Sequence, residues 1–191
     1  MEMIESMDPA VRRKYLETLT GLLPRHSRIL ELGCGSGLPM TRYLVDSNFH
    51  LTGLDISEEQ LALAVKNVPE ADFIHADMTR LCFRKEIFDG VAAFYSVTHV
   101  PRAEHAELLS GISRILKQNG LLVITMGSGE LSDTVESDWL GKLMFFSHFD
   151  GDTNENLVRK AGFEVISAVN EEEIEPDAPV CFRWIVARKT G

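Results

Sequence analysis

Three alternating glycines are the residues of this chain whose spacing most clearly suits a ligand. Gly33, Gly35 and Gly37 lie in ILELGCGSG (29–37), directly after a run of strand-forming residues. Glycines at such a point let a ligand approach the backbone, whose N–H groups can then bind it. A dinucleotide-binding fingerprint would add a glycine at position 38, where this chain has Leu38. The pattern therefore predicts a nucleotide-like ligand and disfavours a dinucleotide.

Two aspartates follow the next two predicted strands. Asp55 can accept hydrogen bonds from both hydroxyls of a ribose, because Ser57 already fills the alternative role of capping the next helix. Asp77 could accept from an adenine amino group while Met78 packs on the ring, although an ordinary turn aspartate is the alternative. In this order, the glycines and aspartates indicate a ligand that contains a ribose and an adenine.

Short apolar runs alternate with helical periodicity along the chain. The segments that read as strands are 26–32, 49–56, 71–76, 88–97, 120–127, 163–169 and 180–189. Apolar residues between the first five recur at the i, i+3, i+4 spacing of helices, and an amphipathic helix is expected over 9–22. The last two strands are joined by the acidic run 171–177 without a helix, which predicts an antiparallel hairpin around a solvated loop.

This order of elements predicts an α/β fold. We expect a Rossmann-like three-layer sandwich with a seven-stranded, mostly parallel sheet and an antiparallel C-terminal hairpin. A single domain should span 1–191, because this length fits one domain and no repeat or linker divides it. Ligands of such sheets bind at the carboxyl ends of the strands, near the point where the strand order reverses. The glycines and both aspartates come at those ends.

The composition disfavours several partners. A net charge of −10 argues against nucleic acid, since phosphate backbones are bound by clustered Lys and Arg. Three cysteines without a CxxC pair and six scattered histidines indicate neither a disulfide framework nor a metal site. Neither a secretory signal nor an apolar segment of about 20 residues is visible. We therefore expect a cytoplasmic protein with no membrane partner.

Five segments together resemble the class I S-adenosylmethionine-dependent methyltransferases, over about residues 9–189. ILELGCGSG resembles their first motif, LTGLDIS their acidic ribose loop and FIHADM their adenine loop. FDGVAAFYSVTHV is similar to their fourth-strand motif, and ILKQNGLLVIT to the helix, turn and strand that follow. The resemblance is closest to the small-molecule branch that includes quinone-biosynthesis methyltransferases. It implies S-adenosyl-L-methionine as cofactor, S-adenosyl-L-homocysteine as product, and in-line methyl transfer to a small-molecule acceptor.

The resemblance also implies roles for individual residues. Those expected to bind the cofactor are Tyr15, Glu31, Gly33, Cys34, Gly35, Gly37, Asp55, Ile56, Asp77, Met78, Phe94 and Tyr95. Glu31 would organise the amino-acid end of the cofactor, while Phe94 and Tyr95 would approach the reacting methyl group. Tyr15 would belong to an N-terminal lid helix over 9–22, and a plain core position is the alternative.

The acceptor side is expected to involve the insert 128–150, which is too long for a bare connection. Its aromatic and methionine side chains suit an apolar pocket, although they could instead pack a short helix onto the sheet edge. The residues expected to contact the acceptor are Tyr95, His99, Trp139, Phe145, Phe146 and His148. His99 and His148 are candidates for a general base, and a hydrogen-bonded structural histidine is at least as good an interpretation of each.

Two other functions share part of the pattern. An NAD-dependent oxidoreductase would have the glycines and Asp55 but gives no reason for Asp77. A non-catalytic S-adenosylmethionine-binding regulatory protein would keep the binding residues without turnover. FYSVTH (94–99) lacks the Asn/Asp-Pro-Pro-aromatic segment of nucleic-acid amino-methyltransferases, which again disfavours nucleic acid. CFRWIV (181–186) could form a sheet edge or a homodimer surface, with a core position for Trp184 as the alternative.

Overall fold

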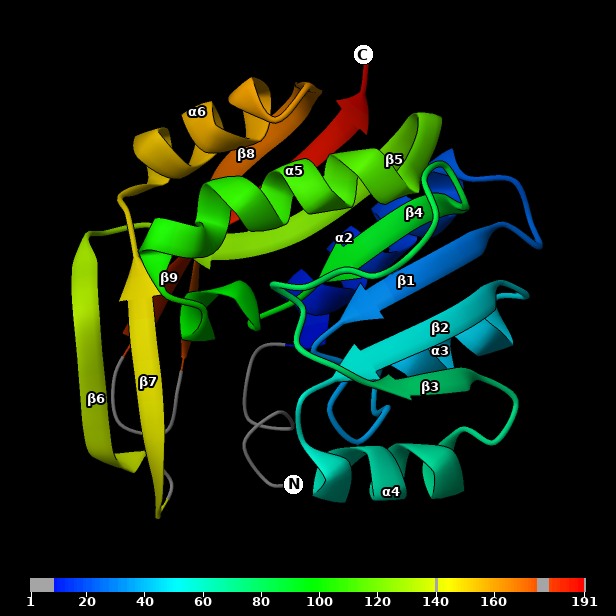
Figure 1. Ribbon diagram of the computed structural model, residues 1–191, viewed down its shortest axis with the longest axis horizontal. Coiled ribbons are helices and arrows are strands. Elements are labelled where there is room, and N and C mark those ends of the chain that lie inside the picture. The colour runs from blue at the N-terminus through cyan, green and yellow to red at the C-terminus, as the bar shows by residue number, and fades with distance from the viewer. Residues whose placement is uncertain (1–8, 140, 175–178, 191) are drawn as a thin grey trace.

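A seven-stranded sheet forms the centre of the computed structural model, which describes residues 9–139, 141–174 and 179–190 (Figure 1). Its strand order is β3-β2-β1-β4-β5-β9-β8, and β9 runs antiparallel to both of its neighbours. The other neighbouring strands pair in parallel. The strands are β1 (Arg28–Leu32), β2 (His50–Asp55), β3 (Asp72–His75), β4 (Phe88–Ala93), β5 (Leu116–Gly127), β8 (Phe163–Ile174) and β9 (Pro179–Lys189). The predicted α/β sheet with its antiparallel C-terminal hairpin is confirmed.

Helices cover both faces of this sheet. In Figure 1, α5 and α6 lie in front of the sheet and α2 and α3 lie behind it. Their bounds are α2 (Pro9–Leu22), α3 (Met40–Asp46), α4 (Glu58–Asn67), α5 (His105–Ile115) and α6 (Gly151–Lys160), with short 3-10 turns η1 (Val97–His99) and η2 (Arg102–Glu104). Each face has its own buried apolar cluster, one including Leu108 and Ile112 and the other including Leu19 and Trp184. Within the described ranges, every helix is too short or too polar to cross a membrane.

Local sequence explains where the helices begin. Ser57 caps α4 by accepting a hydrogen bond from the N–H of Gln60 at 3.3 Å, as the sequence predicts. Asp150 caps α6 and accepts from the N–H groups of Asp152 and Thr153, both at 3.0 Å. Both helices therefore begin at residues whose side chains satisfy backbone groups that the helix leaves unbonded.

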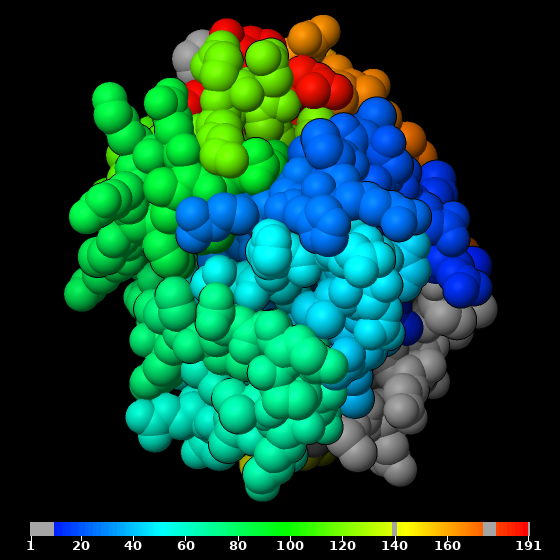
Figure 2. Space-filling view, turned by 90° about the vertical axis from the view of Figure 1, so that its right-hand side faces the viewer, coloured from blue at the N-terminus to red at the C-terminus, as the bar shows by residue number. Residues whose placement is uncertain are grey.

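The strand order reverses beside β1, which lies between β2 and β4. In register, Glu31 of β1 lies opposite Gly53 on one side and Ala92 on the other. The carboxyl ends of these three strands consequently meet at one edge of the sheet, where α/β folds bind ligands. β3 forms one outer edge of the sheet. Figure 2 shows the molecule from the right-hand side of Figure 1, where β1 and β2 begin, which is opposite to their carboxyl ends.

The fourth strand is shorter than predicted. It ends at Ala93 rather than at residue 97, because Tyr95 takes a left-handed conformation (φ 55°) and the chain then turns into η1. The N–H of Tyr95 donates to the Thr125 hydroxyl instead of continuing the ladder. The fifth strand, conversely, begins at Leu116 rather than at residue 120, so α5 ends earlier than the sequence suggests.

The prediction of a solvated acidic loop over 171–177 is wrong for its first residues. Residues 171–174 continue β8 and pair with β9, while 175–178 lie outside the described residues. Glu173 is fully buried, and both Glu171 and Glu173 accept hydrogen bonds from tyrosine hydroxyls. Strand alternation puts these two side chains on the same face, so residues 171–173 are half-buried strand rather than loop.

The insert 128–150 forms a two-stranded antiparallel hairpin, neither an irregular loop nor a short helix. Its strands are β6 (Leu131–Trp139) and β7 (Lys142–His148). We call residues 131–148 the insert hairpin. The hairpin extends beyond the sheet at the left of Figure 1, away from α4, which lies at the bottom.

The segment 181–186 belongs to β9, which lies between β5 and β8. It is therefore not a sheet edge, and Trp184 has no exposed surface. The core interpretation of Trp184 is confirmed, and the edges of the sheet are β3 and β8 instead.

Candidate functional site

The glycine turn, residues 33–37, connects β1 to α3 at the carboxyl edge of the sheet. Gly33, Gly35 and Gly37 have φ values of 74°, 54° and 77°, a region that residues with a Cβ rarely adopt. A Cβ on Gly33 would collide with Ser96 of the segment after β4. A Cβ on Gly35 would meet only Gln60 Oε1, at 3.9 Å. Gly35 is therefore bordered by open space, where its backbone is accessible to a ligand.

Asp55, the last residue of β2, holds the glycine turn in place. Its Oδ2 accepts a hydrogen bond from the Gly35 N–H at 2.8 Å, and its Oδ1 accepts from the Ser57 N–H at 2.9 Å. A carboxylate has about four lone-pair sites, so each oxygen keeps capacity for a further donor such as a ribose hydroxyl. Asp55 thus combines a structural role with a geometry that fits ribose binding.

Asp77, Met78 and Ile56 come to the same edge from the ends of β3 and β2. Asp77 Oδ1 accepts from the N–H and the hydroxyl of Thr79, both at 2.8 Å, which is the turn interaction considered above. The Met78 methyl lies 3.5 Å from the position of a Cβ built on Gly33, so Met78 borders the glycine turn. Ile56 is 69% exposed. An exposed apolar side chain at the end of β2 fits the flat face of a base.

Glu31 is a buried acid beneath the glycine turn. It is 1% exposed, and its Oε2 accepts a hydrogen bond from the buried Thr41 hydroxyl at 2.6 Å. Burial raises the pKa of Glu31 to about 8, and the nearby Asp55 charge acts in the same direction. Burial also raises the pKa of the Cys34 thiol, whose sulfur packs close to Gly53. The Cys34 side chain therefore points into the sheet side of the turn as a neutral packing group.

The segment after β4 connects the glycine turn to the C-terminal hairpin. The Ser96 hydroxyl donates to the Leu32 carbonyl at 2.8 Å, which fixes the segment against β1. Phe94 is 3% exposed and packs toward the core, with its ring centroid 5.3 Å from that of Trp184. The Tyr95 hydroxyl donates to both carboxylate oxygens of Glu173, at 3.0 and 2.8 Å. The two aromatic residues thus point into different surroundings.

Tyr15 occupies a core position on α2. Its ring stacks on Trp184 with a centroid distance of 4.2 Å and an interplanar angle of 11°, and only 2% of the residue is exposed. Its hydroxyl donates to Glu171 Oε1 at 3.0 Å. Burial, followed by this hydrogen bond, raises the pKa of Tyr15. Tyr15 fixes α2 to the sheet, and its approach to the cofactor as part of a lid stays a prediction.

His99 joins the insert hairpin to η1. Its Nδ1 lies 2.9 Å from the Phe145 carbonyl oxygen, so Nδ1 carries the proton and donates. Its ring lies 4.9 Å from the Phe146 ring. Burial lowers the pKa of His99, which keeps the imidazole neutral at pH 7. The structure therefore brings His99, Phe145 and Phe146 together.

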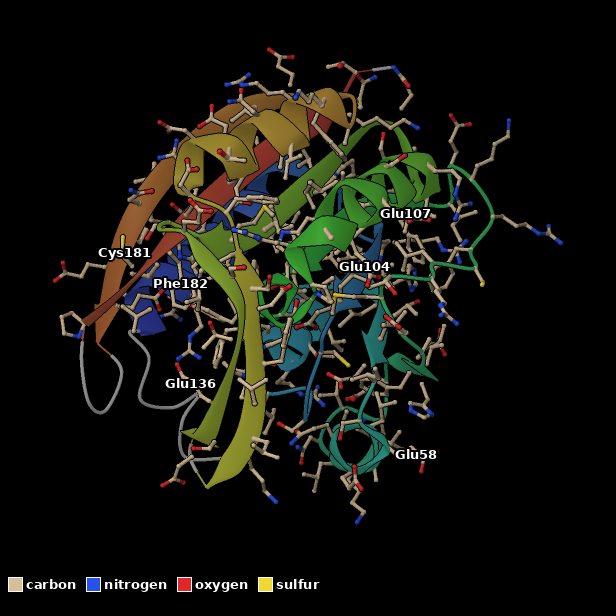
Figure 3. All side chains as sticks on the ribbon, turned by 60° about the vertical axis from the view of Figure 1, so that its left-hand side comes forward. Glu58, Glu104, Glu107, Glu136, Cys181 and Phe182 are labelled. Atoms are coloured by element: carbon tan, nitrogen blue, oxygen red, sulfur yellow. The ribbon has the colours of Figure 1, made fainter. Side chains whose placement is uncertain are left out.

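His148 lies at the base of the insert hairpin. Its Nδ1 hydrogen-bonds with the Gly129 carbonyl at 2.7 Å, and its ring packs directly on Gly127, where any Cβ would collide with it. These contacts anchor the hairpin at the end of β5. Trp139 ends β6, and its side chain lies outside the described residues. Figure 3 shows Glu136 on this hairpin, with Phe182 on β9 near α2.

Several residues of this edge were missed by the motif analysis, above all Glu171 and Glu173. NEEEI carries no sequence signal for them, because its three acids are consecutive; only the structure shows Glu172 exposed between two partly or fully buried acids. Thr41 and Thr125, which hold Glu31 and the backbone of Tyr95, carry no signal beyond their position after a motif.

Among the described residues, no three His, Cys, Asp or Glu side chains are grouped to hold a metal ion. A surface hollow of about 390 Å³ lies between residues 79–82 and α5. It contains none of the predicted site residues, and its partly charged lining includes Arg80 and Glu107. The geometry of the site therefore rests on the glycine turn and its neighbours rather than on this hollow.

Comparisons with known proteins agree with this geometry. Residues 29–120 match the family model described as a methyltransferase domain. An O-methyltransferase of Pyrenophora dematioidea is 26% identical over 183 residues, covering 90% of this chain and 68% of that protein. The 27-O-demethylrifamycin SV methyltransferase of Amycolatopsis mediterranei is 32% identical over 119 residues, covering 58% of this chain but only 43% of that protein.

A solved structure of a SAM-dependent methyltransferase from Methanosarcina mazei has the same fold. Its TM-score is 0.78, with 21% identity and coverage of 95% of this chain and 97% of that one. The matched family model spans β1 to the start of β5, which includes the glycine turn, Asp55, Asp77 and the segment after β4. These findings support a class I S-adenosylmethionine-dependent methyltransferase: residues 29–120 match the methyltransferase-domain model, and the sheet has the fold of such enzymes.

Proposed function

We propose that this protein transfers a methyl group from S-adenosylmethionine to a small-molecule acceptor. The observation that carries the proposal is the bond between Asp55 and the Gly35 N–H at the reversal point of the sheet. It holds an open backbone turn and a carboxylate side by side, which suits a ribose next to the methionine end of the cofactor. The family match favours this cofactor over a nicotinamide dinucleotide.

Each group of the proposed cofactor has a counterpart among the described residues. Asp55 would bind the ribose, Ile56 and Met78 would border the adenine, and the second oxygen of Asp77 would accept from its amino group. Glu31, buried near the end of β1 where the turn begins, would orient the amino-acid end. The cofactor, when bound, supplies a methyl group already activated on a sulfonium.

The protein's own contribution is then alignment and exclusion of water. The segment after β4 and the insert hairpin would enclose the acceptor, beside the rings of His99 and Phe146 and the backbone carbonyl of Phe145. His99 is neutral and tied to the hairpin, so it can orient an acceptor or take its proton. His148 is committed to the base of the hairpin, and we assign it an anchoring role.

The acceptor is a small molecule in this proposal, and a hydroxyl is the first group to test. Two relatives support this choice, since they are named as an O-methyltransferase and a 27-O-demethylrifamycin SV methyltransferase. The enclosed aromatic surroundings of His99 suit an apolar acceptor with one polar group. A cytoplasmic location, a homodimer and the absence of a nucleic-acid partner stay predictions from the sequence.

Calorimetric titration tests the cofactor. We expect S-adenosylhomocysteine to bind and NAD not to bind, and Asp55→Ala to weaken S-adenosylhomocysteine by about 10- to 100-fold, the usual loss for hydrogen bonds to a charged group. Asp72→Ala is the matched control, because Asp72 is an exposed aspartate at the start of the neighbouring strand β3. It should bind like the unchanged protein.

A second assay tests turnover. The protein is incubated with methyl-labelled S-adenosylmethionine and a panel of phenols, alkyl alcohols, amines and thiols, and labelled products are separated. Transfer to any one class supports the enzyme, whereas binding with no transfer to any class favours a regulatory protein. Binding of NAD in place of S-adenosylhomocysteine would overturn the cofactor assignment, and equal binding of S-adenosylhomocysteine by Asp55→Ala would overturn the role of Asp55.

A further inference from the structure

The most unusual side chain outside the motifs is the buried acid Glu173. It has no exposed surface, yet it lies one residue from the end of β8 as described, beyond the exposed Glu172. Burying a carboxylate is costly unless donors compensate for the lost water. Two donors do so here, the Tyr95 hydroxyl, whose proton is shared between both carboxylate oxygens, and Trp184 Nε1 at 3.2 Å. An apolar side chain would fill this core position with a smaller loss of solvation free energy. The carboxylate therefore has a role beyond packing.

Tyr95, whose hydroxyl bonds to Glu173, lies between the glycine turn and the C-terminal strands β8 and β9. It directly precedes Ser96, which packs against Gly33 of the glycine turn. It lies two residues after the end of β4, whose neighbour β1 carries Glu31. On its other side, its ring meets Phe182 and Trp184 edge to face, at 5.1 and 5.5 Å. Tyr95 therefore connects the glycine turn, through Ser96, to the aromatic side chains of β9.

Both ends of Tyr95 are fixed from outside its own segment. Its backbone adopts a φ of 55°, which is uncommon for a bulky residue, and its N–H donates to Thr125 of β5. Its hydroxyl donates to Glu173 of β8. Such a conformation persists only where surrounding contacts determine it, and it concentrates at functional sites.

We propose that Glu173 is a positioning residue for methyl transfer, which holds the ring of Tyr95 beside the place of the reacting methyl group. The inference rests on the proposed function. Because a small displacement of an aligning group can cost about 100-fold in rate, a rigid support for Tyr95 has a clear use. The same carboxylate accepts a hydrogen bond from Trp184, on which Tyr15 stacks. Glu173 therefore fixes α2 and the segment after β4 relative to each other.

The test compares two ligands that differ only at their sulfur atom, beside which the proposal places the ring of Tyr95. S-adenosylmethionine carries a methyl group and a positive charge on sulfur, whereas S-adenosylhomocysteine carries neither. An aromatic ring beside that cation should favour S-adenosylmethionine. We expect Glu173→Ala to lower the affinity for S-adenosylmethionine about threefold more than that for S-adenosylhomocysteine, with a smaller change in Glu173→Gln.

Two further variants keep the test sharp if Glu173→Ala fails to fold. Tyr95→Phe removes only the hydroxyl that Glu173 binds and should shift the affinity ratio in the same direction. Glu172→Gln removes an exposed acid from the neighbouring position of β8 and should leave both affinities unchanged. In a Trp139→Phe background, Trp184 is the only tryptophan, so its fluorescence reports whether the network has moved.

The outcomes separate this inference from the proposed function. If the unchanged protein binds neither ligand, the methyltransferase proposal fails and this inference fails with it. If the unchanged protein binds both, but Glu173→Gln and Tyr95→Phe weaken both ligands equally or not at all, only the positioning role is overturned. A shifted ratio together with altered Trp184 fluorescence, absent in Glu172→Gln, supports it.

Discussion

The two halves of the ligand-binding edge differ in the groups that form them. Beside β1 and β2, the site is mainly backbone, shaped by glycines at positive φ and by Asp55 accepting two N–H bonds. Beside β8 and β9, it is a network of side chains, in which two tyrosine hydroxyls donate to Glu171 and Glu173. Backbone geometry suits a ligand shared by a whole family, whereas side chains can change with the acceptor. We expect substitutions in the first half to affect folding and cofactor binding most.

The largest effect is expected at Gly33. Gly33→Ala would force a Cβ into Ser96 at a φ of 74°, and we expect it to lower the free energy of unfolding by about 2–4 kcal/mol. Urea denaturation measures the change. Gly129→Ala is the matched control, since an added Cβ there meets no atom within 4 Å. Equal stability of the two variants would show that the turn is not tightly constrained.

A smaller effect, dependent on pH, is expected at Glu31. Its folded-state pKa of about 8 lies above the ordinary glutamate pKa of 4.5, so between these values the folded protein keeps a proton that the unfolded chain has lost. Stability should therefore fall as pH rises through this window. Glu31→Gln cannot ionise, so the unfolding free energy of the unchanged protein should fall relative to the variant by up to about 1.4 kcal/mol per pH unit.

Denaturation of both proteins at about pH 5, pH 6.5 and pH 8 would measure this difference. The ligand-free protein is used, so that cofactor binding does not contribute. Parallel stability curves would mean that Glu31 is ionised throughout, and that it is better solvated than its burial implies.

The smallest effect is expected at His99, on the side-chain half of the site. An asparagine amide can donate to the Phe145 carbonyl as Nδ1 does, so His99→Asn should cost less than about 1 kcal/mol, and His99→Ala about 1–2 kcal/mol. Denaturation at neutral pH gives both values. Equal losses in the two variants would contradict a tether between η1 and the insert hairpin.

The cofactor half could be predicted from the sequence because its signals are local. A glycine turn after a strand, an acid after the next strand and a helix cap each involve a few consecutive residues. Ser57 and the 9–22 helix lie where expected, and the sheet has the predicted class. The roles of the predicted cofactor residues stay predictions.

The other half, with β8, β9 and the insert hairpin, could not be predicted because its structure depends on contacts between residues far apart in the sequence. Glu173 reads as a loop residue until Tyr95 and Trp184 supply donors from other strands. LSDTVESDW (131–139) shows no apolar alternation, so β6 forms through its pairing with β7 rather than through its own pattern. The early end of β4 likewise depends on Thr125, a residue of another strand.

The position of β9 has a consequence for how the chain is made. Residues 179–189 are synthesised after β8 but lie between it and β5, so each of those strands has an unpaired edge until β9 has left the ribosome. Trp184 and Phe182 arrive with that strand, and the surroundings of Tyr95 are completed only then. A nascent chain can thus form the cofactor turn well before the acceptor side exists. If translation stops within residues 179–189, β5 and β8 keep unpaired edges. Chaperones bind chains that expose such edges.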